Sequence, residues 1–367
     1  MDDTILWLSA AGAALLSLGL VPLAIRLAFA LGLLDLPGAH KRHRNPTPFV
    51  GGIAMFIIVW LTVILTGLLA PGLSDLFSVE LLFIFLGALI IVLVGFSDDL
   101  SPVSAWVKLL AQIGAGTVLY LGGLHVELLT TPTGSIAVGW LSPIITVLWV
   151  VGLTNAINLI DGLDGLAAGV SLIGAATMLV IGVLYNIGSS LLFLTALIGF
   201  LAVFLWFNRF PARIFLGDSG SMQIGYYFAV VSLLVPVKSY TATALYLPLI
   251  VLGVPIIESA SSLFRRLFSG KSIMKADRRH LFHYLALAGW SRRKVVLAFY
   301  CLAIVFGLFA LAMYYLNRPL LFSLLIIFMV VIFAAFLIIT NNLADRRRGR
   351  TTARRDENEL KQSDTDG

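Results

Sequence analysis

The densest group of chemically useful side chains lies in residues 155–167, which read Asn-Ala-Ile-Asn-Leu-Ile-Asp-Gly-Leu-Asp-Gly-Leu-Ala. Four polar residues fall within ten positions of this stretch, namely Asn155, Asn158, Asp161 and Asp164. Amides and carboxylates are costly at membrane depth unless they face a cavity, a partner or a ligand. The two glycines can open the backbone and expose N–H groups to phosphate oxygens. The stretch therefore favours a functional site over an ordinary polar loop. A calcium loop is excluded, because Leu172 occupies the position of its bidentate Glu.

Two further segments carry acids beside a cation or an aromatic ring. The adjacent carboxylates of Asp98 and Asp99 repel each other unless a cation or proton lies between them, which favours a metal, although a helix cap would also explain them. Lys108 follows in the next predicted helix, where it could meet a phosphate. Phe215 and Asp218 precede a helix start rich in Gly and Ser, and helix N-termini favour anions.

Two basic loops complete the candidate set. Residues 35–52 include three prolines and three glycines, and such a rigid loop can hold Lys41 and His43 as anion ligands. Residues 265–283 contain Gly-Lys-Ser, but no glycine stands at the leading position of a Walker motif and no strand precedes it. In the same loop, His280 and His283 fit phosphate contact better than zinc, since no cysteine accompanies them.

A membrane bundle must position these residues. The 367 residues are 59% hydrophobic and 12% charged, with mean hydropathy +0.99, whereas about 25% of residues are charged in soluble domains. The single cysteine, Cys301, excludes a disulfide framework. We predict an all-α integral membrane protein with a catalytic domain over 1–343 and a disordered charged tail over 344–367. Apolar segments of spanning length predict about eleven transmembrane helices, at 5–33, 50–70, 80–97, 103–122, 138–154, 165–186, 189–207, 220–236, 241–264, 294–316 and 319–340.

Basic residues concentrate in alternate loops of this predicted bundle. One set of loops holds the basic residues of 41–44, 209–213 and 265–294 and the tail, whereas the other set holds only Lys238 and Arg318. The positive-inside rule then places the N-terminus outside and the C-terminus in the cytoplasm. The candidate acids fall on the same side as the basic loops. We therefore expect the site at the cytoplasmic face of the plasma (inner) membrane.

Carboxylates, cations and glycine turns at one face suit Mg²⁺ and phosphoryl transfer. Mg²⁺ prefers oxygen ligands, uses few protein carboxylates and completes its shell with water and substrate phosphate. In phosphoryl transfer, positioning and charge neutralisation supply most of the catalysis. A site at the lipid boundary indicates that one reactant is itself a lipid.

Five ordered motifs resemble the polyprenyl-phosphate N-acetylhexosamine-1-phosphate transferases of glycosyltransferase family 4, multi-pass enzymes that start bacterial cell-envelope glycan synthesis. The motifs are Asp35-x-Pro37 with Lys41-x-His43 and Pro46-Thr-Pro-x-x-Gly-Gly52; Asp98-Asp99; residues 155–167; Phe215-Leu-Gly-Asp-Ser-Gly-Ser221; and Asp277-x-x-His280-x-x-His283. Each motif is weak alone. Together they cover nearly the whole membrane region, each in a loop that charge asymmetry assigns to the cytoplasm.

The resemblance implies transfer of a sugar-1-phosphate from a UDP-sugar to undecaprenyl phosphate, with release of UMP. It implies Asp218 and Asn158 as ligands of Mg²⁺, for which Mn²⁺ could substitute, and Lys108 as a diphosphate contact. Phe215 would stack on uracil, with Asp164 near the edge of the base. Asp98 and Asp99 would either deprotonate the lipid phosphate or organise metal and acceptor. The remaining implied residues are catalytic Asp161 and His280 and substrate-binding Lys41, His43, Thr47, Asn155, Asp277, Arg279 and His283.

Departures from the family pattern concern the donor sugar. Phe282 stands where many members have a His expected to contact sugar or phosphate, and Glu258 stands where an Asp is more usual. The Pro-Thr-Pro-x-x-Gly-Gly motif resembles the GlcNAc-1-phosphate branch more than the peptidoglycan-precursor branch. UDP-GlcNAc is therefore the leading donor, with a UDP-linked 6-deoxy N-acetylhexosamine or UDP-MurNAc-pentapeptide as alternatives.

Two other classes of function remain open at this point. A secondary transporter or lipid flippase would also need a polar cavity, but we find no convincing internal repeat and the polar groups gather at one face. A non-catalytic scaffold would not need Asp98, Asp99 and Asp218 together. No nucleic-acid partner is expected. Small residues in the helices permit the close packing of a homodimer.

Overall fold

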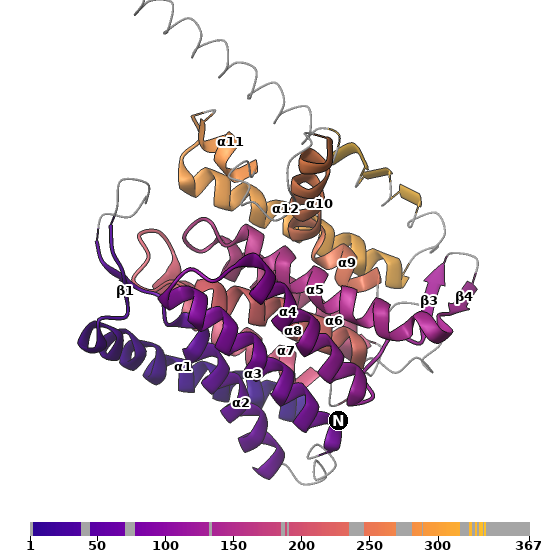
Figure 1. Cartoon of the computed structure of the whole chain (residues 1–367), viewed down its shortest axis with the longest axis horizontal. Coiled ribbons are helices and arrows are strands. Elements are labelled where there is room, and N and C mark those ends of the chain that lie inside the picture. The colour runs from indigo at the N-terminus through magenta and orange to yellow at the C-terminus, as the bar shows by residue number, and fades with distance from the viewer. Residues whose placement is uncertain are drawn as a thin grey trace, which may run out of the picture.

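The computed structural model describes residues 3–37, 45–69, 78–131, 134–184, 188, 191–234, 246–268, 281–287 and 289–315, and a few residues between 323 and 334. Within these residues the chain is mostly helical, with two short antiparallel strand pairs (Figure 1). The predicted tail over 344–367 lies outside the described residues.

The helices lie side by side in one bundle (Figure 1). The long ones are α1 (Asp3–Leu31), α2 (Gly51–Leu69), α3 (Val79–Leu100), α4 (Ala105–Leu121), α5 (Ser142–Ile160), α6 (Leu166–Leu184), α7 (Leu191–Asn208), α8 (Gly217–Leu234), α10 (Gly253–Phe268) and α12 (Arg292–Tyr315). Shorter helical segments are η2 (Gly139–Leu141), α9 (Tyr246–Val251) and α11 (Leu281–Leu287). Apolar faces pack α1 on α7, α6 between α7 and α12, and α4 between α3 and α5.

Among the described residues, seven helical segments are long and apolar enough to cross a membrane. The all-α membrane architecture is thus supported, whereas the predicted eleven spans and their orientation are not confirmed. The segment predicted at 241–264 is not one helix: α9 ends at Val251 and α10 begins at Gly253. Pro255 in the first turn of α10 lacks the N–H that would continue the hydrogen bonding of α9. Most of the segment predicted at 319–340 lies outside the described residues.

The central helix is α8, which packs against both α3 and α5 and also against α2. It is too polar to count as a membrane span by hydropathy, yet nearly all of its residues are buried. Its buried polar groups are hydrogen-bonded, as burial requires. The Gln223 amide donates to the carbonyls of Gly52 and Ser219, and the Tyr226 hydroxyl donates to the Ile84 carbonyl. Neighbouring helices, and not lipid, therefore surround α8.

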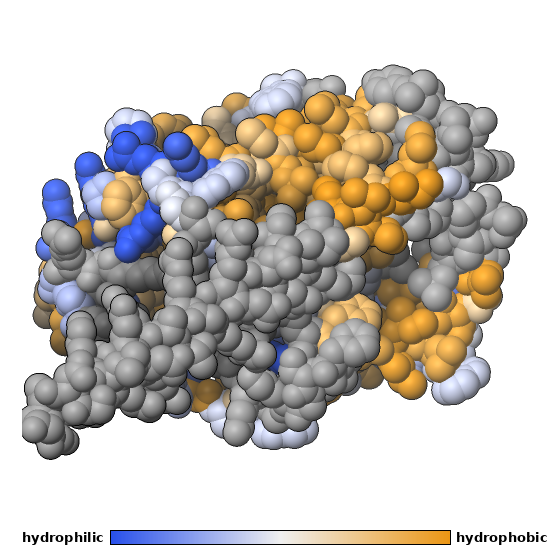
Figure 2. Space-filling view, turned by 90° about the horizontal axis from the view of Figure 1, so that it is seen from above, coloured by the Kyte–Doolittle hydropathy of each residue, from blue (hydrophilic) through white to orange (hydrophobic). Residues whose placement is uncertain are grey.

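The two strand pairs mark opposite ends of the bundle (Figure 1). At one end β3 (Leu128–Thr131) pairs with β4 (Gly134–Ala137), with Leu128 opposite Ala137. At the other end β1 (Leu34–Asp35) pairs with β2 (Thr47–Pro48). In Figure 2, apolar side chains cover much of the visible surface and most hydrophilic residues gather towards one end.

Candidate active site

The carboxylate of Asp99 caps the N-terminus of the central helix α8. It accepts hydrogen bonds from the backbone N–H of Asp218 at 2.7 Å, the backbone N–H of Ser219 at 3.1 Å and the Ser219 hydroxyl at 2.7 Å. Gly217 opens this helix with φ of +73°, and a Cβ there would lie 2.5 Å from the Asp99 carboxylate. The end of α3 and the start of α8 are thereby joined, which fixes where the Asp218 side chain can lie.

Lys108 bridges two carboxylates that are far apart in the sequence. Its Nζ donates to Oδ2 of Asp98 and to Oδ2 of Asp218, each at 2.8 Å. The other oxygen of Asp98 accepts from the backbone N–H of Val103 at 2.7 Å, which holds the turn between α3 and α4. All three side chains are only partly buried, so they can meet a ligand. A cation thus lies between two acids at the loop end of the bundle.

The two asparagines of α5 have different surroundings. Asn158 donates from Nδ2 to the Ser221 hydroxyl at 3.0 Å, which leaves its amide oxygen for another partner. One turn earlier, Asn155 donates to the side-chain oxygen of Gln112 at 2.6 Å, and Gln112 is buried. Gln112 lies four residues after Lys108 on the same helix face, a spacing that could have revealed it from sequence. Asn158 therefore has an oxygen that can bind a ligand, whereas Asn155 makes a structural contact with Gln112 next to the site.

Asp161 follows α5 and is surrounded by other acids. Burial raises the pKa of its carboxyl group, and the nearby charges of Asp218, Asp99 and Asp164 raise it further, to about 8. A carboxyl group in such a place keeps its proton at neutral pH unless a cation joins the group. The arrangement carries an excess of negative charge that a divalent cation would neutralise.

The loop between α7 and α8 is held by two side chains. Asp164 accepts from the Ala212 N–H at 3.1 Å, and Asn208 both accepts from the Gly165 N–H at 3.0 Å and donates to the Ile214 carbonyl at 2.9 Å. Asn208 was not among the predicted site residues, although its amide stands directly before this polar loop.

The same loop pairs with the segment before α2. The backbone N–H of Phe215 donates to the Pro48 carbonyl at 2.7 Å, and the N–H groups of Gly51 and Gly52 donate to the Phe215 and Leu216 carbonyls. Phe215 is thereby fixed close to the start of α8, with its ring partly exposed. Thr47 in β2 is buried, and its hydroxyl donates to the Asn45 carbonyl at 3.1 Å. Thr47 therefore shapes this segment and does not join the acidic cluster.

The structure describes only part of the two basic loops at 35–52 and 265–283. Lys41, His43, Asp277, Arg279 and His280 lie outside the described residues, as does the side chain of His283. The start of α11 is described, and the Leu281 N–H donates to the Glu258 carboxylate at 2.9 Å. Glu258 is 1% exposed, so this acid from α10 fixes the end of the loop.

The Phe282 side chain is buried against the 155–167 stretch. Its side chain is 1% exposed, and its ring lies so close to Gly162 that a Cβ at that glycine would collide with it. At this position the chain therefore uses an apolar ring in the packing of the 155–167 stretch.

The described residues fit a magnesium ion that is completed by substrate and water. No three His, Cys, Asp or Glu side chains among them form a ready cluster for a metal. Mg²⁺ seldom uses such a cage and takes one or two carboxylates together with phosphate oxygens. Asp218, the amide oxygen of Asn158 and the surplus negative charge around Asp161 supply what that mode of binding needs.

Comparisons with known proteins identify the family of this chain. A glycosyl transferase family 4 profile matches residues 81–236. The chain is 37% identical over 300 residues to a probable undecaprenyl-phosphate N-acetylglucosaminyl 1-phosphate transferase of Bacillus subtilis, covering 80% of this chain and 81% of that protein. It is 33% identical to a decaprenyl-phosphate N-acetylglucosaminephosphotransferase of Mycobacterium tuberculosis, covering 75% and 74%. It is 30% identical to a phospho-N-acetylmuramoyl-pentapeptide-transferase of Shouchella clausii, covering 83% and 94%.

These matches support the transferase prediction, and none of the relatives named here is a transporter. The chain therefore belongs to the polyprenyl-phosphate N-acetylhexosamine-1-phosphate transferases of glycosyl transferase family 4.

Proposed function

We propose that the protein transfers GlcNAc-1-phosphate from UDP-GlcNAc to undecaprenyl phosphate, releasing UMP and forming a polyprenyl diphosphate sugar. One observation carries the proposal beyond family membership: Lys108 joins Asp98 and Asp218 directly beside the helix start that Asp99 caps. This brings a cation, an acid and an anion-favouring helix terminus to one point, as the joining of two phosphate-bearing reactants requires.

The choice of donor rests on two supports. Relatives that act on N-acetylglucosamine, by their names, match at 37% and 33% identity, whereas the muramoyl-pentapeptide relative cited above matches at 30%. The Pro46-Thr-Pro-x-x-Gly-Gly segment holds the loop of Phe215 by backbone hydrogen bonds, so its sequence can influence how the nucleotide end of the donor is held.

Lys108 is the residue we assign to the diphosphate. Its ammonium group is shared by two carboxylates, and a bound diphosphate would compete for the same donor. A preorganised cation of this kind stabilises charge that develops on phosphate oxygens, and loss of one such group typically costs about 3 kcal/mol in the barrier.

The two adjacent acids receive different roles in this proposal. Asp99 is a positioning residue, because both of its oxygens are engaged by the start of α8. Asp98 is left as the acid that can face the acceptor phosphate, since its partners are Lys108 and a backbone N–H. It would accept a proton from the lipid phosphate or hold the acceptor in line.

Asp218 and Asn158 are the residues that would hold Mg²⁺, with Mn²⁺ as a substitute. When bound, the metal would neutralise the diphosphate and polarise its phosphorus–oxygen bonds. Phe215 would stack on uracil and Asp164 would lie near the edge of the base. The distribution of basic residues supports the cytoplasmic face of the inner membrane as the location of this reaction, by the positive-inside rule.

The test is UMP release by purified protein supplied with Mg²⁺, undecaprenyl phosphate and a panel of radiolabelled donors. We expect UDP-GlcNAc to be used in preference to its C4 epimer, the 6-deoxy variants and the muramoyl-peptide donor. Asp218→Asn should lower turnover by at least roughly 10² through weaker metal binding. Glu80→Gln is the matched control, because Glu80 is an exposed acid at the opposite end of α3. Absence of UMP release with every donor would refute the proposal.

A further inference from the structure

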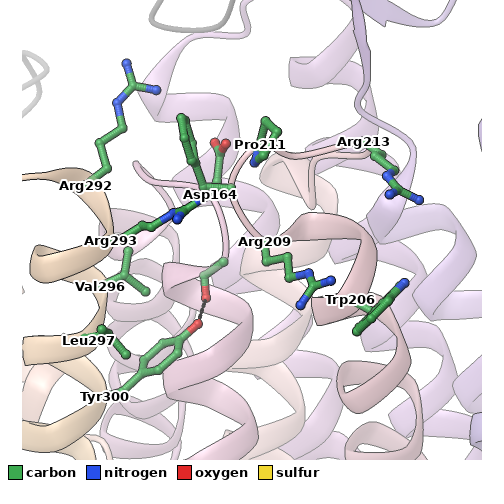
Figure 3. Close-up of a pocket in the computed structure, with 12 residues that line it drawn as sticks. Asp164, Trp206, Arg209, Pro211, Arg213, Arg292, Arg293, Val296, Leu297 and Tyr300 are labelled. Atoms are coloured by element: carbon green, nitrogen blue, oxygen red, sulfur yellow. Dashed lines mark hydrogen bonds between the residues drawn. The ribbon is translucent and has the colours of Figure 1, made fainter.

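A second polar cavity lies beside the acidic cluster and is lined by arginines. It has a volume of about 550 Å³ and opens between the end of α7, the start of α12 and the loop at Asp164 (Figure 3). Four arginines line it, namely Arg209, Arg213, Arg292 and Arg293. The reaction proposed above uses none of these residues.

The arginines leave the cavity with a surplus of positive charge. Within the described part of the chain, Asp164 is the one acid in its lining, and one oxygen of that carboxylate accepts from the Ala212 backbone. Among the described residues, no ion pair joins Arg209, Arg213 or Arg293 to a carboxylate. Arg209 lies over the Trp206 ring at 3.7 Å, and Arg293 lies 5.9 Å from the Phe210 ring. Aromatic rings thus hold two of the guanidinium groups close to the cavity, while their N–H donors remain for an anion.

The lower wall of the same cavity is apolar and faces the surroundings of the bundle. Val296, Leu297 and Tyr300 descend along α12 below Arg293, and the Tyr300 hydroxyl anchors the wall by donating to the Gly165 carbonyl at 2.6 Å (Figure 3). Leu297 is 59% exposed and Trp206 is 58% exposed. Both belong to helices that are candidate membrane spans, so their exposed surfaces would lie against lipid near the membrane boundary.

A nucleotide would not contact this apolar wall, whereas a phospholipid would contact both the arginines and the wall. Leu297 lies four residues after Arg293 and so roughly 6 Å further along the helix axis. That offset matches a ligand with a phosphate at the arginines and hydrocarbon beside the leucine. Basic pockets between membrane helices commonly hold anionic headgroups in this way.

We propose that the cavity of Arg209, Arg213, Arg292 and Arg293 binds the phosphate of an anionic phospholipid, with the first part of its acyl chains against Val296, Leu297 and Trp206. The bound lipid is neither donor nor acceptor in the transfer reaction. Its phosphate would join the end of α7 to the start of α12 and so support the loop that Asp164 holds.

The test measures lipid binding, so its outcome does not depend on the transferase activity. Full-length protein in detergent is titrated with phosphatidylglycerol, phosphatidylcholine or inorganic phosphate, and bound molecules are counted by native mass spectrometry. We expect preference for phosphatidylglycerol. The double variant R209Q/R293Q should weaken that binding by about 30-fold, since each surface arginine contributes about 1 kcal/mol to contact with anionic lipid. Phosphatidylcholine binding should not change.

Two further variants make the result specific. Lys294→Gln removes an exposed charge directly beside Arg293 that does not line the cavity, and it should leave binding unchanged. R209K/R293K keeps both charges and should keep most of the binding. This variant still tests the role of the charges if R209Q/R293Q does not fold. Equal affinity for both lipids, equal loss in Lys294→Gln, or inorganic phosphate binding as tightly as phosphatidylglycerol would each overturn the proposal.

Discussion

Replacing Asp99 by asparagine should separate a positioning role from a catalytic one. The Asp99 carboxylate accepts two hydrogen bonds from the backbone of α8 and one from the Ser219 hydroxyl, and both of its oxygens are engaged. An asparagine of the same shape offers one oxygen, and its NH₂ group would face an N–H donor on the other side. Asp99→Asn therefore changes the capping of α8 and leaves the space around it almost unchanged.

The expected loss can be estimated from these contacts. Hydrogen bonds to charged groups contribute about 1.5–3 kcal/mol each, and the substitution removes one or two of the three. We expect the first turn of α8 to lose about 2–4 kcal/mol of stability against local opening, of which 2 kcal/mol corresponds to about 30-fold in an equilibrium constant. A shift of about 1 Å at Asp218 would lower turnover by roughly 10².

Hydrogen exchange and UMP release measure the two effects in the same preparation. In Asp99→Asn, amides at the start of α8 should exchange at least about 30-fold faster, together with the loss of turnover. Asp98→Asn is the control: it should lower turnover while the exchange of α8 stays as in the wild type, because Asp98 bonds Lys108 and Val103. Unchanged exchange at α8 in Asp99→Asn, with turnover lost, would refute the positioning role.

Three further predictions concern other parts of the site. Lys108→Met should lower UMP release at saturating donor by at least about 10², because two carboxylates lose their shared cation; turnover close to wild type would contradict this. The raised pKa of Asp161, about 8, means that the protonated group contributes stability that is fully present below about pH 4 and is lost as the pH rises through 8. In metal-free detergent, the unfolding free energy of the wild type relative to Asp161→Asn should therefore decrease as the pH is raised from about 4 to 8. Parallel plots of unfolding free energy against pH for the two proteins would exclude the raised pKa of Asp161. Phe282→His should destabilise the fold by about 2–4 kcal/mol in thermal unfolding without widening the range of donors, because the ring is buried against Gly162; a stable variant that accepts new donors would show that the position faces substrate.

The sequence identifies most residues of the acidic cluster because polar side chains are costly in apolar segments unless they face a cavity, a partner or a ligand. Asp161, Asp164 and Asp218 stand out on that ground alone, and the structure places their charges close enough to affect one another. The contact between Lys108 and Asp218, which lie 110 residues apart in the sequence, could not be predicted in this way. It depends on how α3, α4 and α8 pack, and no local spacing encodes that packing. The ordered motifs indicated a shared site, but not which atoms would meet.

Adjacent residues of a helix point in directions about 100° apart, so Asp98 and Asp99 cannot serve one contact together. The sequence shows the pair but not which member faces α8. The structure resolves this through Gly95, one turn earlier on α3, where a Cβ would collide with the backbone of Ser219. That close approach brings Asp99 against the start of α8 and leaves Asp98 towards Lys108.

The same reasoning explains why hydropathy counts the helices of this bundle poorly. A hydropathy window measures preference for lipid, and α8 is surrounded by other helices, where a hydrogen-bonded Gln223 is stable. Its polar first half is what allows a capped, anion-favouring terminus to lie at the loop end of a membrane bundle. A span is predicted at 220–236, yet among the described residues the polar start of α8 keeps it out of the seven helical segments that are apolar enough to cross a membrane. The same polar start supplies Asp218 to the site.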